Sequence, residues 1–331
     1  MIISRTPFRM SLFGGGTDYP DWYLENGGMV LGATIDKYCY LSVRYLPPFF
    51  EHKHRVVWSE IELVNNIDEI RHPAVKAILE EMKFIRGLEI SYNADLPARS
   101  GLGSSSAFTV GLINALTALR GKMISKKALA QDAIRIEQEV IGEAVGSQDQ
   151  IWAAYGGLNK IEFQKDGKFS ISPIIMGEKN YLSLESSLML FFTGFSRAAP
   201  LIAQKKIDNF KNKEEELNML STLASSAASS LQDKNYDIKK IGELIHEAWI
   251  LKRELAEGVT TKEIDEIYKE GLLAGALGGK ILGAGGGGFI LFVVPPENQA
   301  NLQKRLSKLV HVKFNFDSVG SNIVVFEPED E

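Results

Sequence analysis

The chain has 331 residues, 45% of them hydrophobic and 24% charged, which is typical of a globular protein. Its 37 basic and 42 acidic side chains give a formal net charge of −5 without a long block of like charge, so nothing favours nucleic-acid binding. Cys39 is the single cysteine, which favours a reducing compartment. We find no apolar run of signal-peptide or membrane-spanning length, and we expect a cytoplasmic protein with no membrane or nucleic-acid partner.

In the first half of the chain, predicted strands and helices alternate. Residues 2–13 and 38–45 are rich in Ile, Phe, Leu, Val and Tyr, which predicts strands. Residues 73–86 carry apolar side chains at a helical period, and residues 105–119 are small and apolar throughout, as in a buried helix. The remaining predictions here are a helix over 125–141 and strands over 88–93, 158–163 and 188–193.

The second half of the chain is richer in helix. Residues 198–256 are mostly helix formers, with a polar stretch at 211–216. Further predictions are helices over 261–276 and 297–309 and strands over 289–294, 311–316 and 321–326.

A domain boundary is predicted near 165–185, where a turn at 165–168 is followed by Pro173. We therefore divide the chain into domains 1–175 and 176–331. Because helices and strands interleave without a strict βαβ rhythm, we predict an α+β fold rather than a doubly wound sheet.

Three glycine-rich segments stand at 5–19, 97–107 and 280–289. Glycine allows positive φ and lets backbone amides approach a ligand closely. Successive amides that point the same way form a cavity for anions. The three segments together indicate a site that handles phosphate.

The middle segment has the pattern of a phosphate loop. Gly101 and Gly103 free the backbone, and residues 104–106 are serines that lead into an apolar helix. A helix start attracts phosphate through its free amides and its dipole, and a hydroxyl there can bind Mg²⁺. A serine-capped helix after a tight turn is the alternative. The segment is not a Walker A loop, because no lysine follows the glycines.

The third segment satisfies G-x-G-x-x-G over 283–288, but its context is wrong for a dinucleotide site. That fingerprint follows a strand and opens a helix, whereas here a predicted strand follows the glycines. We therefore disfavour NAD binding. The glycines form a bulge, a close approach to a ligand, or a flexible hairpin loop.

Taken together, the segments resemble the motifs of the GHMP kinase superfamily. Residues 97–106 match P-x-x-x-G-L-G-S-S-A, with Ser106 in place of alanine, and residues 280–288 match K-x-x-G-A-G-G-G-G. The first segment has Arg9 and then Gly-Gly-Gly-Thr-Asp-Tyr at 14–19, where the sugar kinases carry G-E-H-T-D-Y. The replacement of Glu-His by Gly-Gly disfavours galactose and resembles the heptose kinases and fucokinases. The resemblance spans residues 5–289.

The resemblance implies a two-domain fold and an ATP-dependent kinase. The N-terminal domain would resemble ribosomal protein S5 domain 2, the C-terminal domain would be ferredoxin-like, and the active site would lie in the cleft between them. ATP and Mg²⁺ are the implied cofactors. The implied ATP-binding residues are Pro97, Ser100, Gly101, Leu102, Gly103, Ser104, Ser105 and Ser106.

Catalytic and metal-binding roles follow from the same resemblance. Asp149 would be the catalytic aspartate, although a helix cap after Gly146 and Ser147 is the alternative. Arg9 would stabilise charge on the transferred phosphoryl group, or would simply pair with a carboxylate inside the fold. The expected Mg²⁺ ligands are Ser105 and Glu137; Glu139 competes with Glu137, and both glutamates also suit a solvated helix face.

The acceptor implied is a sugar phosphate, D-glycero-D-manno-heptose 7-phosphate, phosphorylated at O1 to the 1,7-bisphosphate for nucleotide-activated heptose. Arg197 is the first candidate to hold the acceptor's phosphate, with a surface arginine as the alternative. Lys37, Arg44 and Lys205 remain possible. The other expected substrate-binding residues are Gly15, Gly16, Thr17, Asp18, Gly285 and Gly286, although Asp18 also suits a simple turn.

Two rival functions remain. A fucokinase or another sugar 1-kinase of the superfamily would act on an unphosphorylated sugar. A non-catalytic sensor of sugar and ATP would bind both and turn over neither, although it would have no need for Asp149, Glu137 and Ser105 together.

Overall fold

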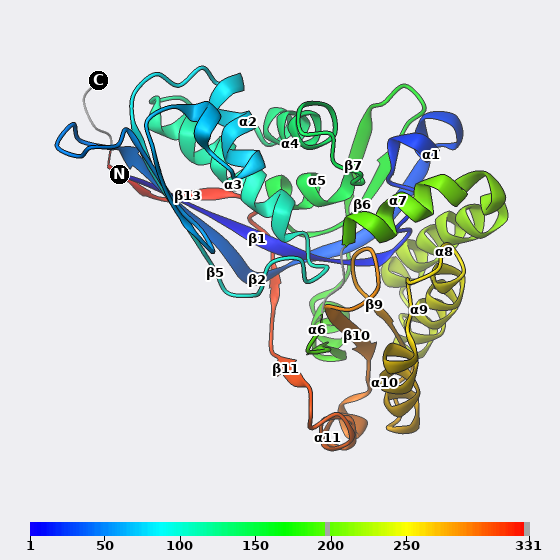
Figure 1. The fold of residues 1–331 in the computed structure, drawn as a ribbon. Helices are drawn as coiled ribbons and strands as arrows, with labels where there is room; N and C mark the ends of the chain where they lie inside the picture. The colour runs from blue at the N-terminus through cyan, green and yellow to red at the C-terminus, as the bar shows by residue number, and fades with distance from the viewer. Residues whose placement is uncertain (196–198, 328–331) are drawn as a thin grey trace.

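The computed structural model describes residues 1–195 and 199–327, which form two sheets flanked by helices (Figure 1). Its strands are β1 Ile2–Phe13, β2 Gly28–Tyr45, β3 His54–Val57, β4 Ile61–Val64, β5 Leu88–Ala94, β6 Leu158–Phe163, β7 Phe169–Pro173, β8 Leu188–Phe192, β9 Gly278–Ile281, β10 Phe289–Val293, β11 Val310–Val312, β12 Phe316–Asp317 and β13 Asn322–Phe326. Its helices are α1 Pro20–Asn26, α2 Pro73–Glu81, α3 Ser104–Leu119, α4 Lys126–Arg135, α5 Gln148–Tyr155, α6 Glu178–Ser186, α7 Ala199–Asn209, α8 Glu214–Gln232, α9 Ile238–Arg253, α10 Lys262–Leu273 and α11 Pro296–Arg305.

The first sheet is built around the long antiparallel pair β1 and β2. Its strand order is β13-β1-β2-β5-β3-β4, with β6, β7 and β12 attached beside this path. The helices α3 and α5 pack on β1 and β2, and the far half of β1 is wholly buried because α8 and α9 contact it as well. This burial explains why residues 8–13 are apolar at nearly every position except Arg9 and Ser11.

The second sheet is smaller and has the order β11-β8-β10-β9. Its strand β10 is buried throughout, and its Phe292 shares a core with Phe191 of β8 and Trp249 of α9. The chain then returns to the first sheet, where β12 pairs with β2 and β13 with β1 (Figure 1). This arrangement of two sheets with separate helices confirms the predicted α+β class. The predicted division at residue 175 stays a prediction; residues 316–326 belong to the first sheet.

Several predicted elements are confirmed and others are longer, shorter or divided. The strands 2–13 and 158–163 are found as predicted. The predicted helix over 73–86 ends at Glu81, because Lys83 takes a left-handed φ of 53°. The helix over 125–141 changes at Ile136 into a π-helical turn, in which Ile141 N donates to Ile136 O.

The elements missed from the sequence are short. They include α1, the hairpin of β3 and β4, and α6. Segments of four to nine residues carry too little periodicity to separate from loops. No helix in residues 1–195 or 199–327 has both the length and the apolar character to cross a bilayer.

Candidate active site

The phosphate loop and the third glycine segment lie directly against each other. Phe289 N donates to Ser100 O at 3.1 Å, and Arg9 N donates to Leu102 O at 3.0 Å. A Cβ on Gly101 would stand 2.6 Å from Leu282 O, and one on Gly288 would stand 2.2 Å from Ser100 O. The third segment joins the antiparallel strands β9 and β10, so it is not a dinucleotide turn. Its glycines permit a close backbone contact rather than a free hairpin loop.

This contact predicts a large effect for Gly288→Ala. At φ +89° the new Cβ would be strained, and it would also collide with the Ser100 backbone, which cannot move aside as a side chain would. We expect the free energy of unfolding to fall by about 2–4 kcal/mol, measured by urea denaturation. The matched control is Gly142→Ala, where φ is +75° and nothing lies within 4 Å of the new Cβ, so only the backbone strain remains. Equal losses in the two variants would disprove the packing argument.

The start of α3 offers free backbone amides to an anion. Its N-cap is Gly103, at a left-handed φ of 74°, and no side chain caps the first turn. Ser104 Oγ instead accepts from Arg99 N at 3.1 Å. The serine-capped helix considered as an alternative is therefore not what the structure shows. Uncapped amides at a helix start are the groups that hold phosphate.

Arg9 and Asp149 form a two-point ion pair beside the phosphate loop. Arg9 Nε donates to Asp149 Oδ1 and Nη2 donates to Oδ2, each at 2.6 Å. The third nitrogen, Nη1, donates to Gly101 O at 2.7 Å. The Arg9 side chain is 5% exposed and that of Asp149 is 23% exposed. Strand β1 thus aims a fixed cation at α5, and the carboxylate that it orients still faces open space.

Asp18 lies next to this pair in a turn that the first glycine segment forms. Gly16 N donates to Asp18 Oδ1 at 2.9 Å, and Gln148 Nε2 donates to Oδ2 at 2.8 Å. Burial raises the pKa of Asp18, and the nearby charge of Asp149 raises it further. Gln148 was not predicted from the sequence, although it directly precedes Asp149. Its Oε1 is buried and has no hydrogen-bond partner among the described residues, so it is free to accept from a sugar hydroxyl.

Of the other predicted substrate-binding residues, Gly15 lies near an unpaired hydroxyl, whereas Thr17, Gly285 and Gly286 contact the protein's own backbone. A Cβ on Gly15 would stand 3.4 Å from Ser11 Oγ, a buried hydroxyl with no partner among the described residues. The Thr17 hydroxyl bonds to Gly14 O and Met29 O, so it shapes the turn rather than facing a ligand. Gly286 N donates to Val259 O at 2.9 Å, and Gly285 packs against the same residue.

Glu137 is buried in the π-helical turn, against the start of α3. Ser106 Oγ donates to Glu137 Oε2 at 2.8 Å, and Gln150 Nε2 donates to the same oxygen at 2.5 Å. The other oxygen, Oε1, is buried without a hydrogen-bond partner among the described residues. Burial raises the pKa of Glu137 to about 7, although the Thr109 hydroxyl and the bonds from Ser106 and Gln150 act in the opposite direction.

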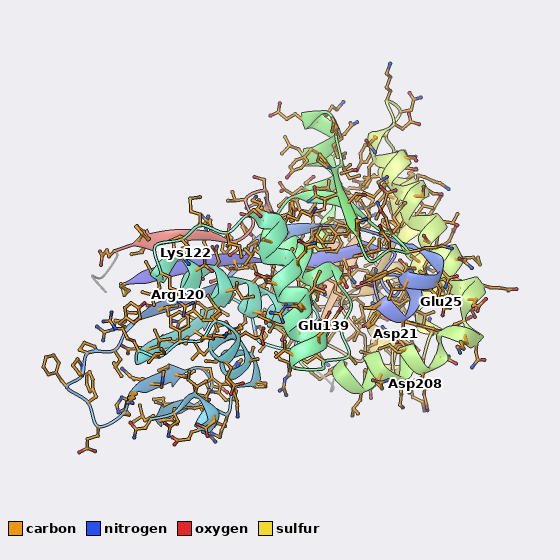
Figure 2. The ribbon with its side chains drawn as sticks, turned by 90° about the horizontal axis from the view of Figure 1, so that it is seen from above. Asp21, Glu25, Arg120, Lys122, Glu139 and Asp208 are labelled. Carbon is orange, nitrogen blue, oxygen red and sulfur yellow. The ribbon has the colours of Figure 1, made fainter. Side chains whose placement is uncertain are left out.

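This carboxylate fits a Mg²⁺ site better than its competitor does. Glu139 is exposed and lies on the outer surface in Figure 2. Ser105, the predicted hydroxyl ligand, is exposed in the first turn of α3, whereas its neighbour Ser106 is the serine bonded to Glu137. Within the described residues no group of three His, Cys, Asp or Glu side chains could hold a metal. One or two carboxylates suffice for Mg²⁺ when phosphates complete its coordination.

Of the four cations predicted for the acceptor's phosphate, the three in the described residues lie beside carboxylates other than Asp18 and Asp149. Arg197 lies outside the described residues. Lys37 pairs with Asp36, and Arg44 pairs with Glu89 on β5. Lys205 is 57% exposed, and its Nζ lies 3.9 Å from Glu257.

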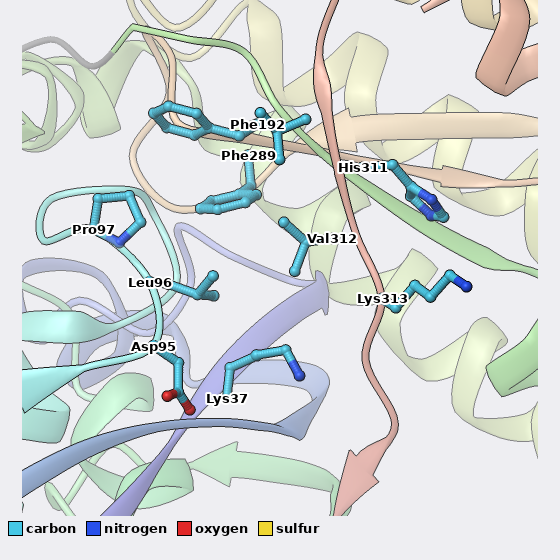
Figure 3. A pocket seen from close by; sticks show the side chains of 10 residues that line it. Lys37, Asp95, Leu96, Pro97, Phe192, Phe289, His311, Val312 and Lys313 are labelled. Atoms are coloured by element: carbon cyan, nitrogen blue, oxygen red, sulfur yellow. The ribbon is translucent and has the colours of Figure 1, made fainter. Parts of the chain in front are cut away.

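A cavity of about 630 Å³ lies beside Pro97, where the phosphate loop begins (Figure 3). Leu96 and Pro97 form one wall, and Phe192, Phe289 and Val312 form the other. The lining of the cavity includes Pro97, which is one of the residues predicted to bind ATP. It does not include Asp149, Glu137 or Asp18. The cavity is therefore distinct from the Arg9–Asp149 centre.

Comparison with known proteins places these features in one family. Residues 68–157 match the model of the GHMP kinases N terminal domain, and residues 227–311 match that of the GHMP kinases C terminal. A D-glycero-alpha-D-manno-heptose 7-phosphate kinase from Campylobacter jejuni is 30% identical, over 93% of this chain and 93% of its own. An L-fucokinase/L-fucose-1-P guanylyltransferase from Bacteroides fragilis is 26% identical, over 92% of this chain and 36% of its own.

Solved structures agree with this grouping. The crystal structure of a D-glycero-D-manno-heptose 1-phosphate kinase from Bacteroides thetaiotaomicron superposes with a TM-score of 0.81 at 23% identity, covering 99% of this chain and all of the other. The chain belongs to the GHMP kinase superfamily, and its two-sheet α+β fold is the fold of these kinases. It is an ATP-dependent phosphotransferase of a family whose members generally use ATP and Mg²⁺.

Proposed function

We propose that this protein transfers the γ-phosphoryl group of ATP to O1 of D-glycero-D-manno-heptose 7-phosphate. The observation that carries the transfer chemistry is the Asp149 carboxylate, oriented by Arg9 beside the uncapped start of α3. The Campylobacter jejuni relative supports the acceptor, because it is named for this substrate and matches along nearly the whole chain.

Each group in the site has a defined task in this reaction. Asp149 accepts a hydrogen bond from the O1 hydroxyl and takes its proton as the new O1–phosphorus bond forms and the bond to the ADP oxygen breaks. Arg9 holds the carboxylate in place and offers positive charge next to the transferred group. The amides at the start of α3 receive the nucleotide phosphates. Glu137 and the serines of α3 would hold Mg²⁺, which neutralises charge on the phosphate oxygens in such transfers.

The part of the site that would bind the acceptor sugar is lined by polar side chains with fixed positions. Gln148 donates to Asp18, and the unpaired Gln148 Oε1 and Ser11 hydroxyl can bond to hydroxyls of the sugar. A site built to bond specific hydroxyls rejects analogues that lack them, because its buried polar groups are then left unpaired.

A coupled ADP-release assay with ATP and Mg²⁺ tests the proposal. The panel is D-glycero-D-manno-heptose 7-phosphate, sedoheptulose 7-phosphate, fucose, galactose, mannose and mevalonate. We expect turnover of the heptose phosphate with a kcat/KM at least about 100-fold above that of any other acceptor, since a site with buried polar groups discriminates strongly. Turnover of fucose alone would replace the acceptor and keep the kinase. No turnover by folded protein that binds ATP would favour a sensor.

A further inference from the structure

Lys206 is a buried lysine whose ammonium group has no hydrogen-bond or ion-pair partner among the described residues. Its side chain lies on α7, and the residue is 4% exposed. None of the hydrogen bonds or ion pairs found in residues 1–195 and 199–327 uses its Nζ, whereas two other buried lysines donate to backbone oxygens. Lys252 Nζ donates to Ile281 O and Gly283 O, and Lys280 Nζ donates to Leu12 O. Those two lysines hold the third glycine segment in place, and Lys206 has no such structural task.

The charge of Asp18, a residue of the predicted acceptor site, acts on Lys206. Burial lowers the pKa of Lys206 to about 8, and the charge of Asp18 acts in the opposite direction. Burial lowers the pKa of Lys280 to about 7 and that of Lys252 well below its usual value. The charge of Lys206 adds to both shifts. The ammonium group of Lys206 therefore lies near both Asp18 and these lysines.

Four basic side chains of this region, Arg9, Lys206, Lys252 and Lys280, are each 4% exposed or less. Arg9 is paired with Asp149, and Lys252 and Lys280 donate to backbone oxygens. The Asp18 carboxylate is bonded to Gly16 and Gln148 and not to Lys206. Among the described residues the Lys206 ammonium therefore has no bonded partner, and an anion bound beside it offsets the cost of burying its charge.

Packing places the end of α7 beside the turn that carries Asp18. Tyr19, the residue after Asp18, packs edge-to-face on Phe210, four residues after Lys206, with the ring centroids 5.7 Å apart. A Cβ on Gly16 would contact Leu217 of α8 and Leu255, and Asn209 at the end of α7 donates to Leu255 O. The turn at 14–18 therefore packs against α8 and against the residues that end α7.

We propose that Lys206 binds the phosphate group that the acceptor sugar already carries, at the end of the sugar opposite the hydroxyl that is phosphorylated. The inference rests on the proposed function, since it requires a phosphorylated acceptor. An acceptor lying along Asp18 presents its reacting hydroxyl to Asp149 and its phosphate to the free ammonium group. The phosphate gives the buried ammonium of Lys206 its anionic partner, and the ammonium donates a charge-assisted hydrogen bond to it.

The test compares Lys206→Met with wild-type protein and with Lys211→Met, which removes an exposed lysine shortly after α7. We expect Lys206→Met to raise the KM for heptose 7-phosphate by about 10- to 100-fold, the range of one hydrogen bond to a charged group. Its kcat changes by less than about threefold and its calorimetric ATP affinity is unchanged, because a group that binds ground and transition state equally affects KM alone. Lys211→Met matches the wild type.

Other outcomes overturn the inference. An unchanged KM in Lys206→Met means that Lys206 does not hold the acceptor. A loss of ATP affinity with an unchanged acceptor KM means that it holds a phosphate of the nucleotide. If the wild type turns over heptose 7-phosphate, either of these two results for Lys206→Met leaves the proposed function intact. If the wild type turns over only unphosphorylated sugars, the proposed function and the role of Lys206 are both wrong.

A measurement on the wild-type protein keeps the test valid if the variant fails to fold. Without ATP, calorimetry should show heptose 7-phosphate binding at least about tenfold more tightly than the unphosphorylated heptose. Equal affinities would contradict a cation reserved for the phosphate. Lys206→Gln, which keeps a polar head without the charge, should lose this preference.

Discussion

Replacing Asp149 by asparagine is expected to lower kcat by about 10³-fold, within the range measured for removal of a general base. The asparagine side chain has the same shape, but it cannot take the proton of the acceptor hydroxyl. Its amide nitrogen would also face one of the two Arg9 nitrogens that now donate to the carboxylate. The effect is measured in the ADP-release assay, with calorimetry to show that the ATP affinity changes little.

Two controls separate chemistry from folding in this experiment. Asp208→Asn changes an exposed aspartate on α7, which Figure 2 shows at the surface, and it should leave kcat unaltered. Urea denaturation of Asp149→Asn measures what the broken pair with Arg9 costs in stability. If stable, ATP-binding Asp149→Asn protein kept kcat within about fivefold of the wild type, Asp149 could not be the base.

Replacing Glu137 by glutamine is expected to lower kcat/KM by about 100-fold or more, because a neutral amide is a much weaker ligand for Mg²⁺ than a carboxylate. The Mg²⁺ concentration for half-maximal rate should rise in parallel. Glutamine fills the same space and can still accept from Ser106 and Gln150. Glu139→Gln is the matched control, since Glu139 is two residues away and exposed.

Without metal, the stability of Glu137→Gln should depend on pH differently from that of the wild type. Burial raises the folded-state pKa of Glu137 from 4.5 to about 7. A group with a raised pKa contributes stability that is complete below its unfolded pKa and is lost as pH rises through the folded value. Metal-free wild-type protein should therefore lose stability between about pH 4.5 and 7 relative to Glu137→Gln, and Mg²⁺ with nucleotide should restore it.

Thermal unfolding of both proteins at pH 5, 6, 7 and 8, with and without Mg²⁺ and a non-hydrolysable ATP analogue, measures this difference. Parallel pH curves for the wild type and Glu137→Gln would show that Glu137 is not the titrating group. Loss of the Mg²⁺ dependence in Glu139→Gln instead would transfer the metal site to Glu139.

The buried lysines connect the fold to the reaction. Lys252 and Lys280 bind the backbone of the third glycine segment and the end of β1, and so position that segment against Ser100 and Gly101. The contact between the third glycine segment and the phosphate loop thus depends on these two side chains.

Local patterns in the sequence were sufficient for much of the fold. The strand over 2–13 and the buried helix after the phosphate loop follow from runs of apolar residues long enough to show their burial. The resemblance to the kinase motifs predicted Asp149 and Arg9 in one site, and the structure joins them by two hydrogen bonds. These features can be predicted because apolar runs and short motifs consist of residues that are close together in the sequence.

Only the tertiary structure decided which side chains complete the site. Gln148 reaches Asp18 across 130 positions of the sequence, and Ser106 rather than Ser105 turns toward Glu137. Lys205 and Lys206 are identical in type and adjacent, yet helix α7 exposes the first and buries the second. A sequence records neither the rotation of a helix against its neighbours nor the return of β13 to β1, because both are set by packing between segments far apart in the chain.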